Sequence, residues 1–152
     1  MVIQNIVVAT HGSFKIKEVL MGRIVNKGEQ VYVAILESPH TGLSYHAIGL
    51  DGDSIALECF SKALGNIDKE QWHEHTEAIH VYRVFPYVFA FNMDDIEVLP
   101  NNSIVMPAGA DCIKLGVALV SFLSPEEPGQ PLGFKYNFMK VDQRRVYDHH
   151  AN

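Results

Sequence analysis

The sequence has 152 residues and a formal net charge of −6 at pH 7, and apolar residues make up 47% of it. This composition is that of a globular chain with a full hydrophobic core, and it argues against disorder. The negative charge disfavours binding to a nucleic-acid backbone as the main activity, and no apolar run approaches the ~20 residues of a membrane helix. Two cysteines do not make a disulfide framework, so we expect reduced thiols in a soluble, cytoplasmic protein.

Strand signals dominate the first third of the chain. Runs rich in β-branched residues predict strands over Val2 to Ala9, Gln30 to Leu36 and Tyr45 to Leu50. The segment from Phe14 to Leu20 fits a short helix capped by Ser13 and fits a strand equally well, so its state is left open.

The clearest helix signal runs from Ser54 to Leu64. Ser54 stands where an N-cap belongs, and Gly65 stands where the residue after the helix belongs. Ile55, Cys59 and Ala63 form one row at helical spacing, which predicts a buried face. Cys59 is therefore expected to pack in the core rather than to carry chemistry.

The segment from Asp68 to Ile79 has two interpretations. Asp68 followed by Gln71 resembles a capping box and favours a helix, whereas an extended chain leading into the next strand is the competing prediction. From His80 onward strands are expected at close spacing; the runs are His80–Phe85, Tyr87–Phe91, Ile96–Leu99, Ser103–Met106, Ile113–Leu123 and Phe134–Val141.

Many short strands separated by turn residues predict a mainly β (α+β) fold, either a barrel or a sandwich with one or two helices. An α/β sandwich built from an early strand-helix-strand unit is the competing architecture. Residues 1–141 are expected to form a single globular domain, and residues 142–152 a polar tail that is partly disordered.

Two partial motifs give the chain a resemblance to the cupin superfamily. Pro107 and Gly109 match the second cupin motif, with Asn101 at the position of its first glycine and Cys112 at the position of its histidine. His73-Glu-His75 matches the start of the first motif, although His80 stands where an acid is expected. The resemblance implies a cupin-like β-barrel with a metal held by residues of these motifs.

Strand geometry gives a physical basis for such a metal site. Alternate residues of a strand point to one face, so His73 and His75 would project together, and His80 and Cys112 would complete four ligands. Imidazole and thiolate ligands suit a divalent transition metal (Zn, Fe, Mn, Ni or Cu) rather than Mg or Ca.

The helical interpretation of the same segment places different residues together. On a helix, His73, Glu77 and His80 share a face and His75 turns away, so Glu77 and His80 would form a Glu-x-x-His pair. A solvated loop or helix face without any metal explains the polar residues more simply. His40 and His46 flank a Gly/Ser loop and show no partner pattern.

Three functions remain open at this stage. The first is a metal-dependent small-molecule enzyme, such as an isomerase, lyase or oxygenase. The second is a non-enzymatic barrel that binds a nucleotide or sugar through the aromatic side chains of Tyr82, Phe89 and Tyr136. The third is an interaction protein whose strand edges pair in a homo-oligomer.

Overall fold

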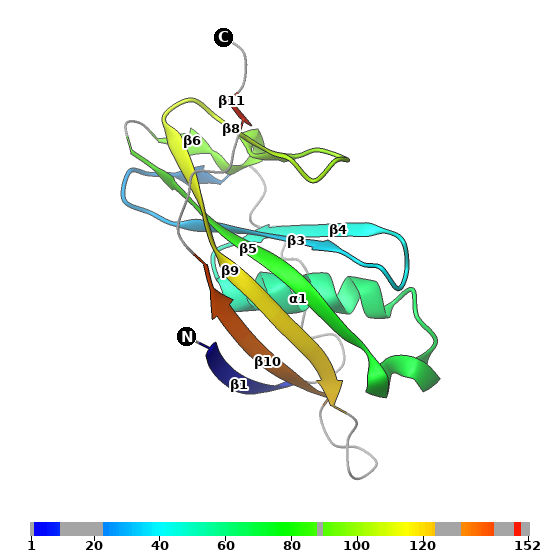
Figure 1. Cartoon of the computed structure of the whole chain (residues 1–152). Coiled ribbons are helices and arrows are strands. Elements are labelled where there is room, and N and C mark those ends of the chain that lie inside the picture. Colours follow the sequence, from blue (N-terminus) through cyan, green and yellow to red (C-terminus); the bar gives the residue numbers. More distant parts are fainter. Residues whose placement is uncertain (1, 10–22, 88–89, 124–131, 142–147, 150–152) are drawn as a thin grey trace.

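The protein is mainly β, with a single α-helix among the described residues. The structure, a computed structural model, describes residues 2–9, 23–87, 90–123, 132–141 and 148–149. Its main element is a six-stranded antiparallel sheet (Figure 1). In spatial order the strands are β1 (Val2–Ala9), β10 (Leu132–Lys140), β9 (Ala110–Leu123), β5 (Thr76–Pro86), β3 (Val31–Glu37) and β4 (Ser44–Gly49).

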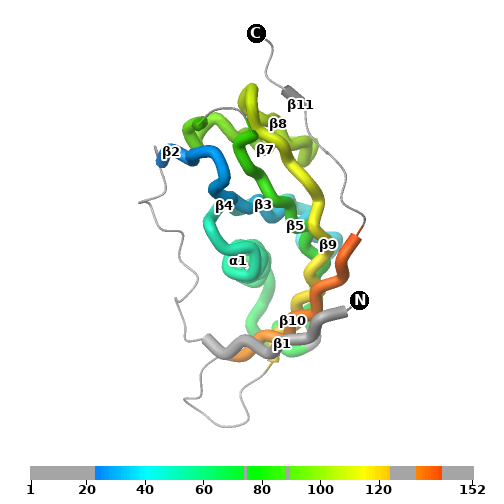
Figure 2. The backbone as a smooth tube through the Cα atoms, turned by 90° about the vertical axis from the view of Figure 1, so that its left-hand side faces the viewer, coloured from blue at the N-terminus to red at the C-terminus, as the bar shows by residue number. Residues whose placement is uncertain are grey.

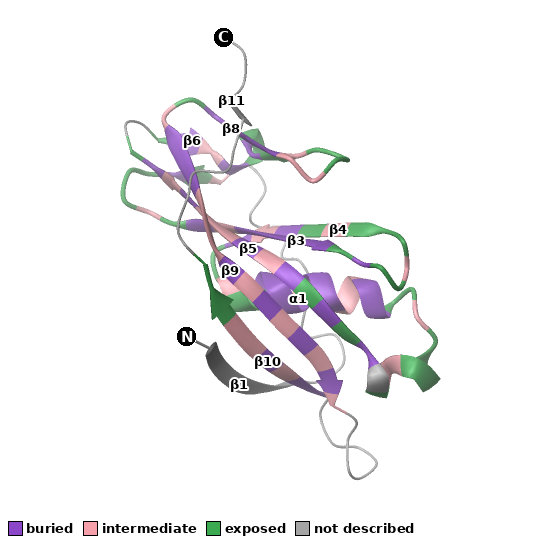
Figure 3. Ribbon diagram, viewed as in Figure 1, coloured by how far each residue is buried: buried purple, intermediate pink, exposed green. Residues whose placement is uncertain are grey.

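The sheet curves around the helix α1 (Gly52–Leu64), which lies on its concave face (Figure 2). The main core fills the space between them, and it includes Phe60, Ile79, Val120 and Phe134. Phe60 is completely buried, which contributes about 1.5–3 kcal/mol relative to an exposed side chain. The alternation of buried and more exposed residues along β5 and β9 is visible in Figure 3.

The helix follows the predicted span but begins earlier. Asp51, rather than Ser54, is the N-cap, and its Oδ2 accepts hydrogen bonds from the Ser54 backbone N–H and hydroxyl. Gly65 keeps right-handed helical angles, with φ −61°, so its position does not depend on a left-handed conformation. The predicted burial of Cys59 is confirmed, since its side chain is fully buried.

A second, smaller core lies at the other end of the long strands. Short elements cover it: β2 (Ile24–Val25), β6 (Phe91–Asn92), η3 (Met93–Asp95), β7 (Glu97–Val98), β8 (Ile104–Met106) and β11 (Asp148–His149). Val33, Val84, Met106 and Cys112 belong to this core. The two cores lie on opposite faces of β3, where Ala34 and Leu36 contact the helix side and Val33 and Ile35 the other side.

Gly116 marks an irregular point in the sheet. The pairing of β5 with β9 shifts register between Val81 and Tyr82. At Gly116 an added Cβ would lie 2.2 Å from the Met139 carbonyl oxygen, so only glycine lets β9 and β10 approach this closely.

The segment from Asp68 to Ile79, for which helix and strand were both predicted, contains both conformations. Lys69–Glu74 form a 3-10 helix, η2, and β5 begins at Thr76. The continuous helix that would place His73, Glu77 and His80 on one face is therefore wrong. The strand interpretation is right only from Thr76 onward, because the chain at His73 is helical.

The predicted mainly β, α+β class is confirmed, and the arrangement is sandwich-like. The described strands do not close into a barrel. None of the described helices is both long and apolar enough to cross a membrane. The segment from Phe14 to Leu20 lies outside the described residues.

Candidate functional site

A buried polar cluster lies where β3 ends and β5 begins. The ladder pairs Ile35 of β3 with His80 of β5, and continuing it by three residues brings Ser38 opposite Glu77. The Ser38 hydroxyl donates a 2.5 Å hydrogen bond to Glu77 Oε2. His75 precedes Glu77 by two residues and lies on the same side of the chain, and its Nε2 is 2.7 Å from the same oxygen. Sheet pairing therefore builds the cluster from residues that are 39 positions apart.

His75 is fixed by backbone contacts on both sides. Its N–H donates to the Trp72 carbonyl oxygen at the end of η2, and its own carbonyl oxygen accepts from the Phe122 N–H in the sheet. Trp72 is held in turn, since its indole Nε1 lies 3.0 Å from the carbonyl oxygens of Leu64 and Ile67. The His75 ring also packs 5.7 Å from that of Phe60. The imidazole is thus positioned by η2, the sheet and α1 together.

His40 reaches the cluster from the loop between β3 and β4. Ser38 organises this loop, because its Oγ accepts from the backbone N–H groups of His40 and Thr41, each at 3.3 Å. The Gly42 N–H closes the turn on the Ser38 carbonyl oxygen, and Gly42 takes the positive φ of 71° that this turn requires. His40 Nδ1 then lies 3.4 Å from Glu77 Oε2.

The cluster is deeply buried except for His40. The side chains of His75 and Glu77 are 5% and 1% exposed, whereas that of His40 is 52% exposed. The two imidazole rings meet edge to face with centroids 4.6 Å apart. A carboxylate in such a dry position needs donors or a cation, and three groups converge on its Oε2.

His40, Glu77 and His75 each offer one ligand atom, and these atoms lie within 4.8 Å of one another. Two imidazoles and one carboxylate are a ligand set used by catalytic zinc sites and, as a facial triad, by non-haem iron. The residues present therefore fit a metal ion. It is the only such group of three or more among the described residues.

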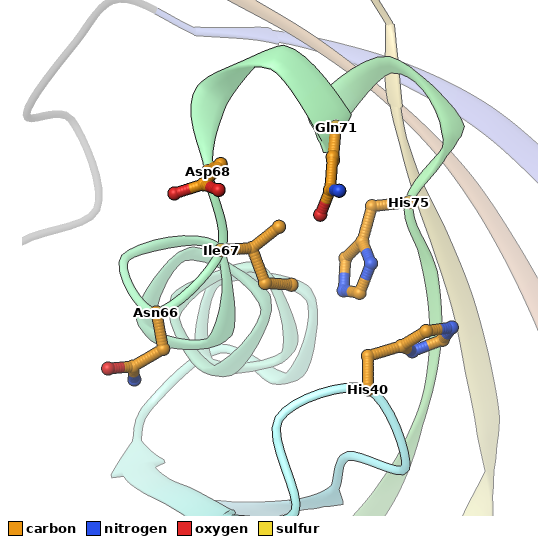
Figure 4. A pocket seen from close by; sticks show the side chains of 6 residues that line it. All are labelled: His40, Asn66, Ile67, Asp68, Gln71 and His75. Atoms are coloured by element: carbon orange, nitrogen blue, oxygen red, sulfur yellow. The ribbon is translucent and has the colours of Figure 1, made fainter.

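An open pocket of about 500 Å³ adjoins this group. Its lining residues are His40, Asn66, Ile67, Asp68, Gln71 and His75 (Figure 4). They come from the β3–β4 loop, the segment that follows α1, η2 and the residue just before β5. Both imidazoles line this pocket, so a small molecule in it can reach them.

Of the four metal ligands predicted from the sequence, only His75 belongs to this group. His73 is exposed on η2. His80 lies on the face of β5 opposite to Glu77, where burial and the nearby Lys114 lower its pKa. Cys112 packs in the smaller core, and burial, aided by Asp111, raises the pKa of its thiol to about 12, which is unlike a ligating thiolate.

The aromatic residues predicted to bind a ligand do not gather at the pocket. Tyr82 is half-buried against the smaller core. Tyr136 is 2% exposed in the main core, and it is separated from Glu77 by Val120 in the sheet. Its buried hydroxyl has a raised pKa because burial disfavours the charged form and Asp53 lies nearby. Phe89 lies outside the described residues.

Sequence reasoning missed His40, Ser38 and the strand role of Glu77. The spacing His75-x-Glu77 is a strand signal for two ligands on one face, and it was readable from the sequence. Nothing local to His40 identifies it, because its contact with Glu77 depends on the pairing of β3 with β5.

Comparison with known proteins identified no relative of this chain. No protein-family model matches the chain, and neither the curated proteins nor the solved structures contain a significant match. The cupin resemblance stays a prediction, and the candidate site must be judged on its own geometry.

Proposed function

We propose that the protein is a metal-dependent enzyme acting on a small molecule, with His40, His75 and Glu77 as the metal ligands. The observation that carries this proposal is the convergence of three ligand atoms within 4.8 Å beside an open pocket. Three protein ligands leave coordination positions for water or substrate, as in catalytic rather than structural sites.

The ligand set narrows the chemistry. Two imidazoles and a carboxylate suit Zn or Fe(II) better than Mg or Ca, which prefer oxygen ligands. A metal with open positions polarises a carbonyl group or activates water or dioxygen. The Ser38 hydroxyl donates to the same Glu77 oxygen that the imidazoles approach, in the way that outer-shell hydrogen bonds orient metal ligands.

A second candidate function rests on the 2.7 Å contact between His75 Nε2 and Glu77. A histidine oriented by a buried carboxylate is the arrangement of a general base, and His75 lines the pocket. In this alternative the enzyme works without a metal, and Glu77 orients the imidazole.

Elemental analysis of protein purified without an affinity tag separates the two functions. The wild type is compared with Glu77→Gln and His40→Ala, which change the ligands in the structure, and with His73→Ala and Cys112→Ser, which change those predicted from the cupin motifs. We expect about one equivalent of Zn, Fe, Mn, Ni or Cu in the wild type, retained in the second pair and lost or reduced in the first.

Other outcomes have equally clear consequences. Metal lost from His73→Ala and Cys112→Ser, and retained in the first pair, would contradict the ligand set proposed here. A wild type that stays metal-free after reconstitution under reducing conditions would contradict the metalloenzyme and leave the His75–Glu77 pair as the candidate.

A further inference from the structure

We propose that the pocket takes a small molecule with an ammonium group at one end and a carbonyl or carboxylate oxygen at the other. This inference rests on the proposed function, because the oxygen end is assigned to a metal at His40, His75 and Glu77. The ammonium end is assigned to Asp68, which lines the opposite part of the pocket in the view of Figure 4.

Asp68 supplies a negative charge that no described residue compensates. Asp68 is exposed and lines the pocket. Its backbone carbonyl oxygen accepts a hydrogen bond from the Gln71 N–H, but its side chain makes no hydrogen bond or ion pair with another described residue and does not cap η2. The neighbouring Lys69 does not line the pocket, and its Nζ lies 5.8 Å from the centre of the Trp72 ring. Within the described part of the chain, nothing neutralises the Asp68 carboxylate, so it can receive a cationic ligand.

The end of α1 adds to the negative potential on this side. Asn66 and Ile67, which follow the C-cap Gly65, line the pocket, so the negative C-terminal end of the helix dipole lies beside it. Lys62, the basic residue of the last turn, is directed elsewhere, since its Nζ lies 2.8 Å from the His46 carbonyl oxygen. None of the described residues that line the pocket is a lysine or an arginine. This side suits a cation.

The opposite side carries the opposite charge when a divalent metal is bound. One ligating carboxylate and two neutral imidazoles leave a net positive centre, which favours an anionic or carbonyl oxygen. Gln71 lies between the two sides in Figure 4, with a side-chain amide that can donate to or accept from the middle of a ligand. The pocket is thus polarised along its length, as a bifunctional amino compound requires.

Matched hydroxamates test the polarity directly. Alkyl hydroxamates bind metals through their oxygen end, so an amino-terminated and a hydroxyl-terminated compound of equal length differ only at the far end. A short series of chain lengths covers the span from the metal to Asp68. Binding to Zn-loaded protein is measured by calorimetry at low and high salt.

The variants isolate Asp68 from general charge effects. Asp68→Asn removes the carboxylate at the pocket, whereas Glu70→Gln removes the same charge from an exposed position on η2 that does not line it. We expect the wild type to prefer the amino-terminated compound by about two- to fivefold at low salt, as for an exposed ion pair. Asp68→Asn should abolish this preference and Glu70→Gln should keep it.

Each alternative result overturns the inference in a distinguishable way. Equal binding of the two compounds at every length in the wild type would remove the ammonium site and leave the metal centre intact. An equal loss of preference in both variants would assign it to the overall charge of the protein. No hydroxamate binding to any form would overturn the proposed function, and the ammonium site with it.

Discussion

Replacing Ser38 by alanine removes a hydrogen bond that supports the proposed metal site, while all three proposed ligands are retained. The Ser38 hydroxyl donates to Glu77 Oε2 at 2.5 Å and accepts the backbone N–H groups of His40 and Thr41 at 3.3 Å. It therefore joins the carboxylate ligand to the loop that carries His40. Ser38 is 2% exposed, so water does not readily replace the hydroxyl.

The size of the effect follows from these contacts. A hydrogen bond to a charged group contributes about 1.5–3 kcal/mol to stability, and the two long amide contacts contribute less. We expect Ser38→Ala to lower the free energy of unfolding of the metal-free protein by about 2–3 kcal/mol. Because outer-shell partners hold ligands in place, metal affinity should fall about 10–100-fold.

Two measurements and one control make this prediction decisive. Urea denaturation of the metal-free protein gives the stability, and competition with a chromogenic chelator gives the affinity of the folded protein for Zn. Ser121→Ala is the same chemical change at a more exposed serine, which bonds Thr76 on the other side of the sheet, and it should leave both values nearly unchanged. If Ser38→Ala binds Zn within twofold of the wild type, Ser38 does not support the site.

Three further predictions concern the scaffold. Gly116→Ala should cost about 2–3 kcal/mol in urea denaturation, because its Cβ would meet the Met139 carbonyl oxygen at 2.2 Å, whereas Gly133→Ala, with its nearest contact at 3.3 Å, should cost clearly less. Trp72→Phe removes the indole donor to Leu64 and Ile67 and should lower stability by about 1–2 kcal/mol; an unchanged urea midpoint would contradict the role given to that donor. Cys59 and Cys112, whose pKa values burial raises to about 12, should react with a thiol reagent at pH 8 only as fast as the protein unfolds; rapid labelling of the folded protein would refute this.

The fold was largely predictable because its signals are local. Strand and helix periodicity identified β1, β3, β4 and α1 to within a few residues, and the spacing of Cys59 with its helical neighbours identified a buried face. The boundary at His75 was not predictable in this way. It depends on Trp72, whose indole bonds to the end of α1, and hence on a tertiary contact.

The candidate site was only partly predictable because it is assembled by strand pairing. His75 was predicted to be a ligand from its spacing with His73, but the residues that lie beside it are Glu77, two residues on, and His40, in a distant loop. His80 and Cys112 had suitable chemistry, yet the pleat directs both away from Glu77 and His75. Residue type alone therefore predicts too many metal ligands, since each ligand must also lie on the correct face of its strand.

The three proposed ligands differ in how firmly their side chains are held before a metal binds, and this difference can be tested. His75 and Glu77 are buried and hydrogen-bonded to each other, whereas the His40 side chain is 52% exposed and must lose conformational freedom when it binds. We therefore expect His40→Ala to reduce Zn affinity less than Glu77→Gln, or than His75→Phe, which keeps a ring beside Phe60. His46→Ala, at an exposed histidine outside the group, should have no effect on Zn binding. If His40→Ala caused the largest loss, the metal would be held mainly by the loop, and the buried His75–Glu77 pair would not be its main anchor.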